Sequence, residues 1–103
     1  MIEERIGLDD PDLMREIVSM LIDDTSRQIH LLDSAIRDRN TTECLRLAHY
    51  SKGACANVGA NSAAALFKRI EGNACSGNFD GCADELAVVA QEIERLRAEA
   101  EHI

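Results

Sequence analysis

The sequence has very few aromatic residues: one tyrosine, two phenylalanines and no tryptophan among 103 residues. Hydrophobic residues nevertheless make up 46% of the chain, so the composition does not fit a disordered protein. A core with so few rings must consist of leucine, isoleucine, valine, alanine, methionine and cysteine, a mixture that suits helices better than sheets. The length fits one compact domain, and we expect residues 1–103 to form it.

Positive charge and long apolar runs are also scarce. The formal net charge is −8, which argues against nucleic acid as a partner because phosphate binding needs a basic surface. No run of about 18 apolar residues is present, so we expect no membrane span. The first residues, MIEERIGLDD, are acidic and contain no apolar stretch, so we expect no secretory signal. These absences predict a cytoplasmic protein, and we expect a monomer.

None of the four cysteines belongs to a CxxC pair. A zinc site needs closely paired ligands, so we expect no bound metal. We interpret the cysteines as free and mostly buried thiols of a reducing compartment: Cys44, Cys55, Cys75 and Cys82. A bridge between Cys75 and Cys82 is the alternative.

The single proline, Pro11, stands at the start of a long helical pattern. Asp10 suits the N-cap position before it, and the pattern continues to about Arg37. Apolar residues recur at about 100° per residue and form one stripe: Met14, Ile17, Val18, Leu21, Ile29, Leu32 and Ile36. The stretch IEERIG before Asp10 predicts a short extra helical segment.

A second apolar strip on the same helix consists of Leu13, Met20 and Leu31, offset by about 80° to 100° from the first. Such width indicates either core contacts with two neighbouring helices or a surface that binds a partner. The sequence leaves both interpretations open.

The second predicted helix begins after Asn40, an N-cap for which Glu43 completes a capping box. This helix runs to about Val58, and Gly59 ends it. Asn61 is the predicted cap of a third helix, which continues through SAAALFKRIEGNAC.

A loop, SGNFDG, separates the third helix from a fourth that begins between Asp80 and Ala83. The fourth helix has a seam with alternating spacings of four and three: Cys82, Leu86, Val89, Ile93, Leu96 and Ala100. Short loops between four helices favour antiparallel neighbours. We therefore predict an all-α fold, an antiparallel up-down-up-down four-helix bundle with a short extra N-terminal helical segment.

The second helix carries a histidine, a lysine and a glycine close together. On a helical wheel, Gly53 lies about 40° from His49, and Lys52 about 60° away on the other side. The core stripe lies roughly 140° to 220° from His49 and comprises Cys44, Leu47, Ser51, Ala54 and Val58. His49 therefore points toward solvent or toward a groove with a neighbouring helix.

Gly53 needs an explanation because a glycine inside a helix costs about 1 kcal/mol relative to alanine. It lies on the wrong side of its helix to permit close core packing. We interpret Gly53 as clearance for a bulky group that approaches His49, and Lys52 as a counter-charge. Together the three residues favour an anionic group on the histidine.

The segment AHYSKGACANVGA resembles the signature of histidine-containing phosphotransfer (Hpt) domains, roughly A-H-x-x-K-G-x-x-x-x-x-G. The long segment from DDPDLMREIV to IRDRN is similar to the family's first long helix, and LFKRIEGNACSGN to the helix after the motif. The resemblance therefore covers almost the whole chain. The family's aromatic residues in the first long helix are absent here, which alters core packing and not the chemistry.

The resemblance implies an intermediate of a two-component phosphorelay. His49 would accept a phosphoryl group from a receiver aspartyl-phosphate or from a kinase, and would pass it to a receiver aspartate. Lys52 and Gly53 would be its neighbours, and Glu71 matches the family position whose Gln or Glu reaches the phosphoacceptor ring. Lys68 and Arg69 would add positive potential near the site.

By the same resemblance the partners are a receiver domain of a response regulator or a hybrid sensor histidine kinase. The receiver would hold Mg²⁺, and this chain would bind no cofactor. Because the bundle uses the whole length, we expect no autonomous kinase activity. The alternative function is a helical adaptor that binds a receiver-like partner without phosphotransfer. A metal-binding bundle is less favoured because Arg46, and not a glutamate, stands three residues before His49.

Overall fold

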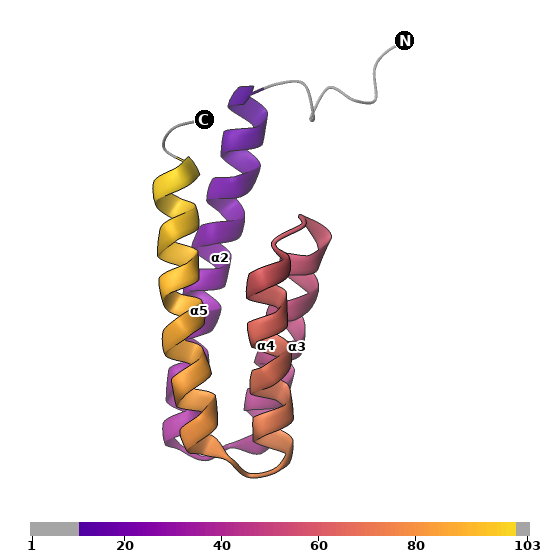
Figure 1. Cartoon of the computed structure of the whole chain (residues 1–103), viewed down its shortest axis with the longest axis vertical. Helices are drawn as coiled ribbons and strands as arrows, with labels where there is room; N and C mark the ends of the chain where they lie inside the picture. The colour runs from indigo at the N-terminus through magenta and orange to yellow at the C-terminus, as the bar shows by residue number, and fades with distance from the viewer. Residues whose placement is uncertain (1–10, 101–103) are drawn as a thin grey trace.

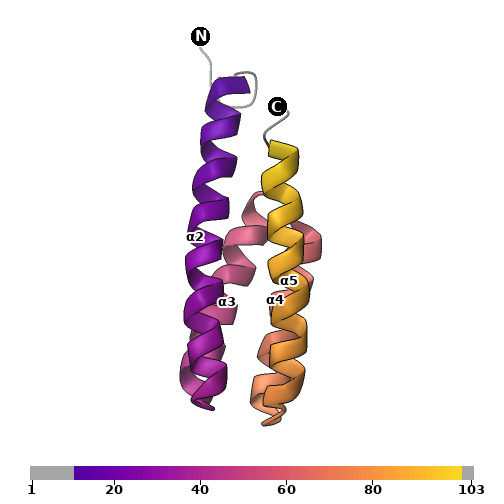
Figure 2. The same ribbon diagram turned by 90° about the vertical axis from the view of Figure 1, so that its left-hand side faces the viewer.

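The computed structural model describes residues 11–100, which form four α-helices. They are α2 (Pro11–Arg37), α3 (Thr41–Asn57), α4 (Asn61–Cys75) and α5 (Phe79–Ala100). Each helix packs against the next along the chain, and α5 packs back against α2 to close the ring (Figures 1 and 2). Successive helices run in opposite directions, which confirms the predicted all-α, up-down-up-down bundle.

Two sequence predictions fall outside the described residues. They are the short N-terminal helical segment and the N-cap at Asp10. Within residues 11–100, no helix is long and apolar enough to cross a membrane.

All three connections have the same hydrogen-bonding pattern. In each, a residue with positive φ ends the helix: Arg39 (54°), Gly59 (80°) and Gly77 (76°). The backbone N–H of the following residue then donates to a carbonyl five positions earlier, at 2.7 to 2.9 Å. This is the Schellman motif, which satisfies carbonyls that the helix end leaves without partners. Each turn is therefore only three residues long, which makes the next helix an antiparallel neighbour.

The cap of α3 was predicted correctly in one respect. The side chain of Asn40 accepts a hydrogen bond from the backbone N–H of Glu43 at 3.1 Å. The reciprocal half of the capping box is not formed, because the Glu43 carboxylate accepts from Arg46 at 2.7 Å instead.

Two other helix starts differ from the prediction. Ala60, not Asn61, occupies the N-cap position of α4. In the tight turn its backbone N–H donates to the Cys55 carbonyl of α3, and its carbonyl accepts from the N–H of Ala64 in α4. Helix α5 begins at Phe79, earlier than expected. Asn78 provides its cap, accepting from the backbone N–H of Gly81 at 2.9 Å. The predicted loop is therefore shortened to its first three residues.

The core lies where the four buried helix faces meet. Its largest fully buried apolar side chains come from three helices: Ile22, Leu32, Phe67, Ile70, Val89 and Ile93. On α3 the predicted stripe is largely correct, since Cys44, Leu47 and Ser51 are buried. Val58 is 50% exposed because α3 ends at Asn57, so that Val58 belongs to the turn and not to the helix.

The helices differ in length, and the difference leaves part of the bundle uncovered. Helices α2 and α5 have 27 and 22 residues, whereas α3 and α4 have 17 and 15. At about 1.5 Å per residue, α2 exceeds α3 by roughly 15 Å. The first turns of α2 and the last turns of α5 therefore extend beyond the α3–α4 connection (Figure 1). This explains why Ile17, predicted to lie in the core stripe, is 41% exposed.

The four cysteines are free, and three of them are buried. Burial raises the pKa of the thiols of Cys44 and Cys55, and that of Cys82 to about 11. Cys75 is exposed at the end of α4 and is not bridged to Cys82. The prediction of free, mostly buried thiols is confirmed.

Two glycines of the same region should respond in opposite ways to alanine. At Gly59 the φ of 80° strains any L side chain, so Gly59→Ala should lower the free energy of unfolding by about 1 kcal/mol. At Gly53 a Cβ would meet nothing within 4 Å, so Gly53→Ala should raise it by about 0.5–1 kcal/mol. Urea denaturation followed by circular dichroism measures both. Equal signs would show that our account of one glycine is wrong.

Candidate functional site

His49 lies in the middle of α3, on the side that faces away from the core. Its side chain is 73% exposed, whereas the neighbouring residues Leu47 and Ala48 are buried. Buried neighbours hold the helix in place, and the imidazole stands free of them. The wheel prediction of an outward-facing histidine agrees with this position.

Glu71 of α4 connects His49 and Lys52. One carboxylate oxygen, Oε2, lies 3.3 Å from His49 Nδ1, and the other, Oε1, accepts a hydrogen bond from Lys52 Nζ at 2.7 Å. Only 21% of the Glu71 side chain and 31% of the Lys52 side chain are exposed. Partial burial weakens solvent screening, so this ion pair is better defined than one on an open surface.

The orientation of Glu71 determines which imidazole nitrogen is available. An ionised carboxylate only accepts hydrogen bonds, so the nitrogen facing it carries the proton. In the neutral ring His49 then has N–H at Nδ1 and a free lone pair at Nε2. The exposed side chain directs this lone pair away from the Glu71 contact. Chemically, the site presents a nucleophilic nitrogen with a cation close by.

Gly53 lies one turn after His49 on the same exposed face of α3. A Cβ at this position would have no neighbour within 4 Å, so nothing in the bundle requires a glycine here. The space above Gly53 is open to an approaching molecule. This geometry agrees with the interpretation of Gly53 as clearance.

The two other cations named from the sequence lie at different places. Lys68 is exposed and lies one turn before Glu71 on α4. Arg69 instead pairs with Glu85 of α5, with 3.8 Å between Nη1 and Oε1. Arg69 therefore belongs to the α4–α5 side, and its expected contribution near His49 is wrong.

The remaining histidines are not part of this arrangement. His30 is exposed on α2, and His102 lies outside the described residues. Across residues 11–100, no group of three or more His, Cys, Asp or Glu side chains is placed to hold a metal ion.

The sequence reasoning overlooked Tyr50, which is 51% exposed. Its hydroxyl donates a hydrogen bond to Asp24 Oδ2 on α2, at 2.9 Å. This bond and the charge of Asp24 raise the pKa of Tyr50, because both favour the protonated phenol, which is the form that donates. A tyrosine directly after the candidate nucleophile was the available signal, but only the packing of α2 against α3 identifies its partner.

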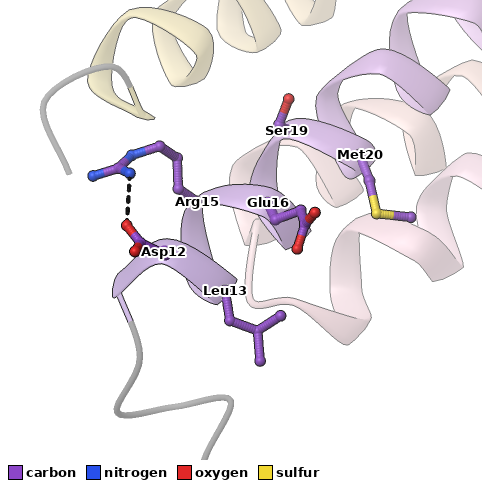
Figure 3. A pocket seen from close by; sticks show the side chains of 6 residues that line it. All are labelled: Asp12, Leu13, Arg15, Glu16, Ser19 and Met20. Carbon is purple, nitrogen blue, oxygen red and sulfur yellow. Dashed lines mark hydrogen bonds and ion pairs between the residues drawn. The ribbon is translucent and has the colours of Figure 1, made fainter.

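The second apolar strip of α2 is not part of the core. Met20 is 66% and Leu31 47% exposed. Of the two interpretations that the sequence left open, a partner surface is the one that agrees with this exposure. Leu13 and Met20 also line a pocket on the first turns of α2, where they project away from the Arg15–Asp12 ion pair (Figure 3).

A comparison with family models matches residues 16–99 to the Hpt domain, a span that includes all of α3 and α4. Comparisons with curated proteins and with solved structures give no match. The matched span covers most of the chain and contains His49, Lys52, Gly53 and Glu71. The chain therefore belongs to the Hpt domain family, whose members transfer phosphoryl groups through histidine in phosphorelays.

Proposed function

We propose that this chain is a phosphorelay intermediate in which His49 accepts a phosphoryl group and Glu71 and Lys52 prepare it for that step. The observation that carries the proposal is the contact between His49 Nδ1 and Glu71, which leaves Nε2 as the free nitrogen on an exposed side chain. An exposed nucleophile suits a reaction in which the donor is another protein. Membership of the Hpt family supports the same reaction class.

In the proposed step the Nε2 lone pair attacks the phosphorus of a receiver aspartyl-phosphate. An N–P bond forms while the P–O bond to the aspartyl carboxylate breaks, and the bonding electrons leave with that carboxylate. The imidazole retains its Nδ1 proton and gains positive charge, which the Glu71 carboxylate offsets. The reverse sequence delivers the phosphoryl group to another receiver aspartate.

Lys52 has two partners in this scheme. In the structure its ammonium is hydrogen-bonded to Glu71, one turn away from His49. A phosphoryl group on Nε2 adds negative charge beside it, so the flexible lysine side chain can turn toward the phosphoryl oxygens. Phosphoryl transfer depends mainly on positioning and charge neutralisation, and a single cation suffices as this chain's contribution.

The partner would be a receiver domain of a response regulator or of a hybrid sensor kinase. We propose that Mg²⁺ is held by the receiver, because the transferred group needs strong charge neutralisation and this site provides only one lysine. The open space above Gly53 supports direct contact between the two proteins.

The proposal is tested by His49→Gln. After incubation with receiver domains phosphorylated on aspartate, the wild-type chain should acquire label that is stable to alkali and labile to acid, and His49→Gln should acquire none. Glutamine removes the nucleophile but retains a polar side chain on the exposed helix face, so folding should be preserved. Circular dichroism of both proteins provides the control.

The adaptor alternative gives a different result in the same experiment. A non-catalytic adaptor would bind a receiver without acquiring label, and His49→Gln would bind equally well. Label that persists in His49→Gln would mean that the acceptor is another residue.

Loss of the site cation should slow the reaction. We expect Lys52→Ala to reduce the transfer rate, or to shorten the lifetime of the phosphorylated form, by about tenfold because one charge-assisted contact is lost. Lys68→Ala removes the same charge from an exposed position on α4 and should have a smaller effect. If both variants changed the kinetics equally, only overall charge would matter and Lys52 would have no specific role.

The clearance at Gly53 is tested by a long side chain. Gly53→Gln should leave the bundle folded, since a Cβ there meets nothing within 4 Å, but should hinder a receiver that approaches His49. We expect transfer from a receiver to fall while labelling by phosphoramidate, a small phosphoryl donor, is retained. Unchanged transfer from the receiver would contradict the steric interpretation.

A further inference from the structure

Tyr50 is held in one orientation beside the candidate nucleophile. It directly follows His49 on α3, and its hydroxyl donates to Asp24 Oδ2 on α2. Asp24 is in turn paired with Arg27, with 2.9 Å between Oδ1 and Nη1. Half of the tyrosine nevertheless remains exposed. An exposed ring fixed at its far end by an interhelical hydrogen bond has lost much of the rotational freedom that surface side chains normally keep.

The hydrogen bond places Tyr50 next to the apolar strip of α2. Met20, Asp24, Arg27 and Leu31 are spaced four, three and four residues apart, so they share one side of that helix. Asp24 stands in the middle of this series, between the exposed Met20 and Leu31. Tyr50, Met20 and Leu31 therefore form one exposed surface across α2 and α3, which we call the Tyr50 face.

The Tyr50 face and His49 can be covered by the same partner. Around the axis of α3, Gly53 lies between His49 and Tyr50, at about 40° from the first and about 60° from the second. Since Gly53 has no side chain and its surroundings are open, no part of α3 separates the imidazole from the tyrosine ring. A protein that places a phosphoryl group at His49 would meet Tyr50 at the same time.

We propose that Tyr50 is a specificity-determining residue, an aromatic anchor that selects the receiver domain whose apolar surface packs against it, and that Asp24 is its positioning residue. This inference rests on the proposed function. Partly exposed tyrosines with a fixed geometry are typical anchors of protein interfaces, because they bury a large area at low conformational cost. The net charge of −8 favours association with a receiver whose docking surface is basic.

The test compares four variants with the wild type, using the receiver domain that phosphorylates the wild-type chain fastest. Rates of transfer are measured as a function of receiver concentration. Tyr50→Ala should raise the half-saturating concentration by about tenfold or more while the maximal rate stays within about twofold. Tyr50→Phe and Asp24→Ala each remove the same hydrogen bond and should raise it by a smaller factor, about two- to fivefold. The double variant that combines Tyr50→Phe with Asp24→Ala should have a half-saturating concentration no higher than either single variant, because both changes remove the same hydrogen bond.

Two controls separate this inference from the proposed function. Labelling of His49 by phosphoramidate should be unchanged in every Tyr50 and Asp24 variant, and its failure in the wild type would overturn the proposed function instead. Val88→Ala removes an equally exposed apolar side chain from α5, which packs against α2 and α4, and should alter nothing.

The proposal is wrong if Tyr50→Ala leaves the half-saturating concentration unchanged. It is also wrong if Tyr50→Ala lowers transfer from all receivers in a panel by one common factor, since a selecting residue must change their ranking. Urea denaturation of each variant shows whether the fold is retained. Tyr50→Phe, which keeps the ring, remains informative if the alanine variant is too unstable.

Discussion

The three-residue turn from Val58 to Ala60 sets the alignment of α3 with α4, and the candidate site depends on that alignment. His49 lies nine positions before this turn begins at Val58, and Glu71 lies eleven positions after it ends at Ala60. In an antiparallel pair, residues at similar distances from the connection come to a similar height. The Schellman motif, with Gly59 at a φ of 80°, fixes the conformation of the turn. The fixed turn brings the Glu71 carboxylate of α4 to the imidazole of His49 on α3. A longer loop would allow α4 to slide, and a shift of one residue would also rotate Glu71 away.

Because of this alignment, Glu71 contacts both His49 and Lys52. Glu71 is partly buried between α3 and α4, where it holds Lys52 by one oxygen and faces His49 Nδ1 with the other. A charge with reduced access to water needs partners, and here the partners are the two residues that the proposed chemistry uses. The ion pair thus keeps the lysine close to His49, and it leaves the outer nitrogen of the ring open to a second protein.

The candidate site and the exposed apolar residues lie on different helices of unequal length. Helices α3 and α4 position His49, Lys52 and Glu71, whereas the longer α2 contributes Met20 and Leu31 to the Tyr50 face. The second apolar strip of α2 is exposed at Met20 and Leu31. The spacing of the strip alone is compatible with core packing or with a partner surface. The exposure of Met20 and Leu31 favours the partner surface. The hydrogen bond from Tyr50 to Asp24 links this strip to the residue next to His49.

The sequence by itself determined what depends on neighbours along the chain. The helical periods, the Asn40 cap, the terminating Gly59 and the outward side of His49 follow from short spacings, because a helix brings only nearby residues together. The resemblance to Hpt domains added Glu71 as a candidate. The sequence did not determine that Ala60 and Asn78 each cap one helix while their N–H groups bond to the helix before it. That arrangement depends on how two successive helices are oriented at the turn. Nor did it determine the Glu71 bridge, the turning of Arg69 toward Glu85, or the partner of Tyr50. These contacts join residues on different helices, and only the packing of the helices against one another decides which side chains meet.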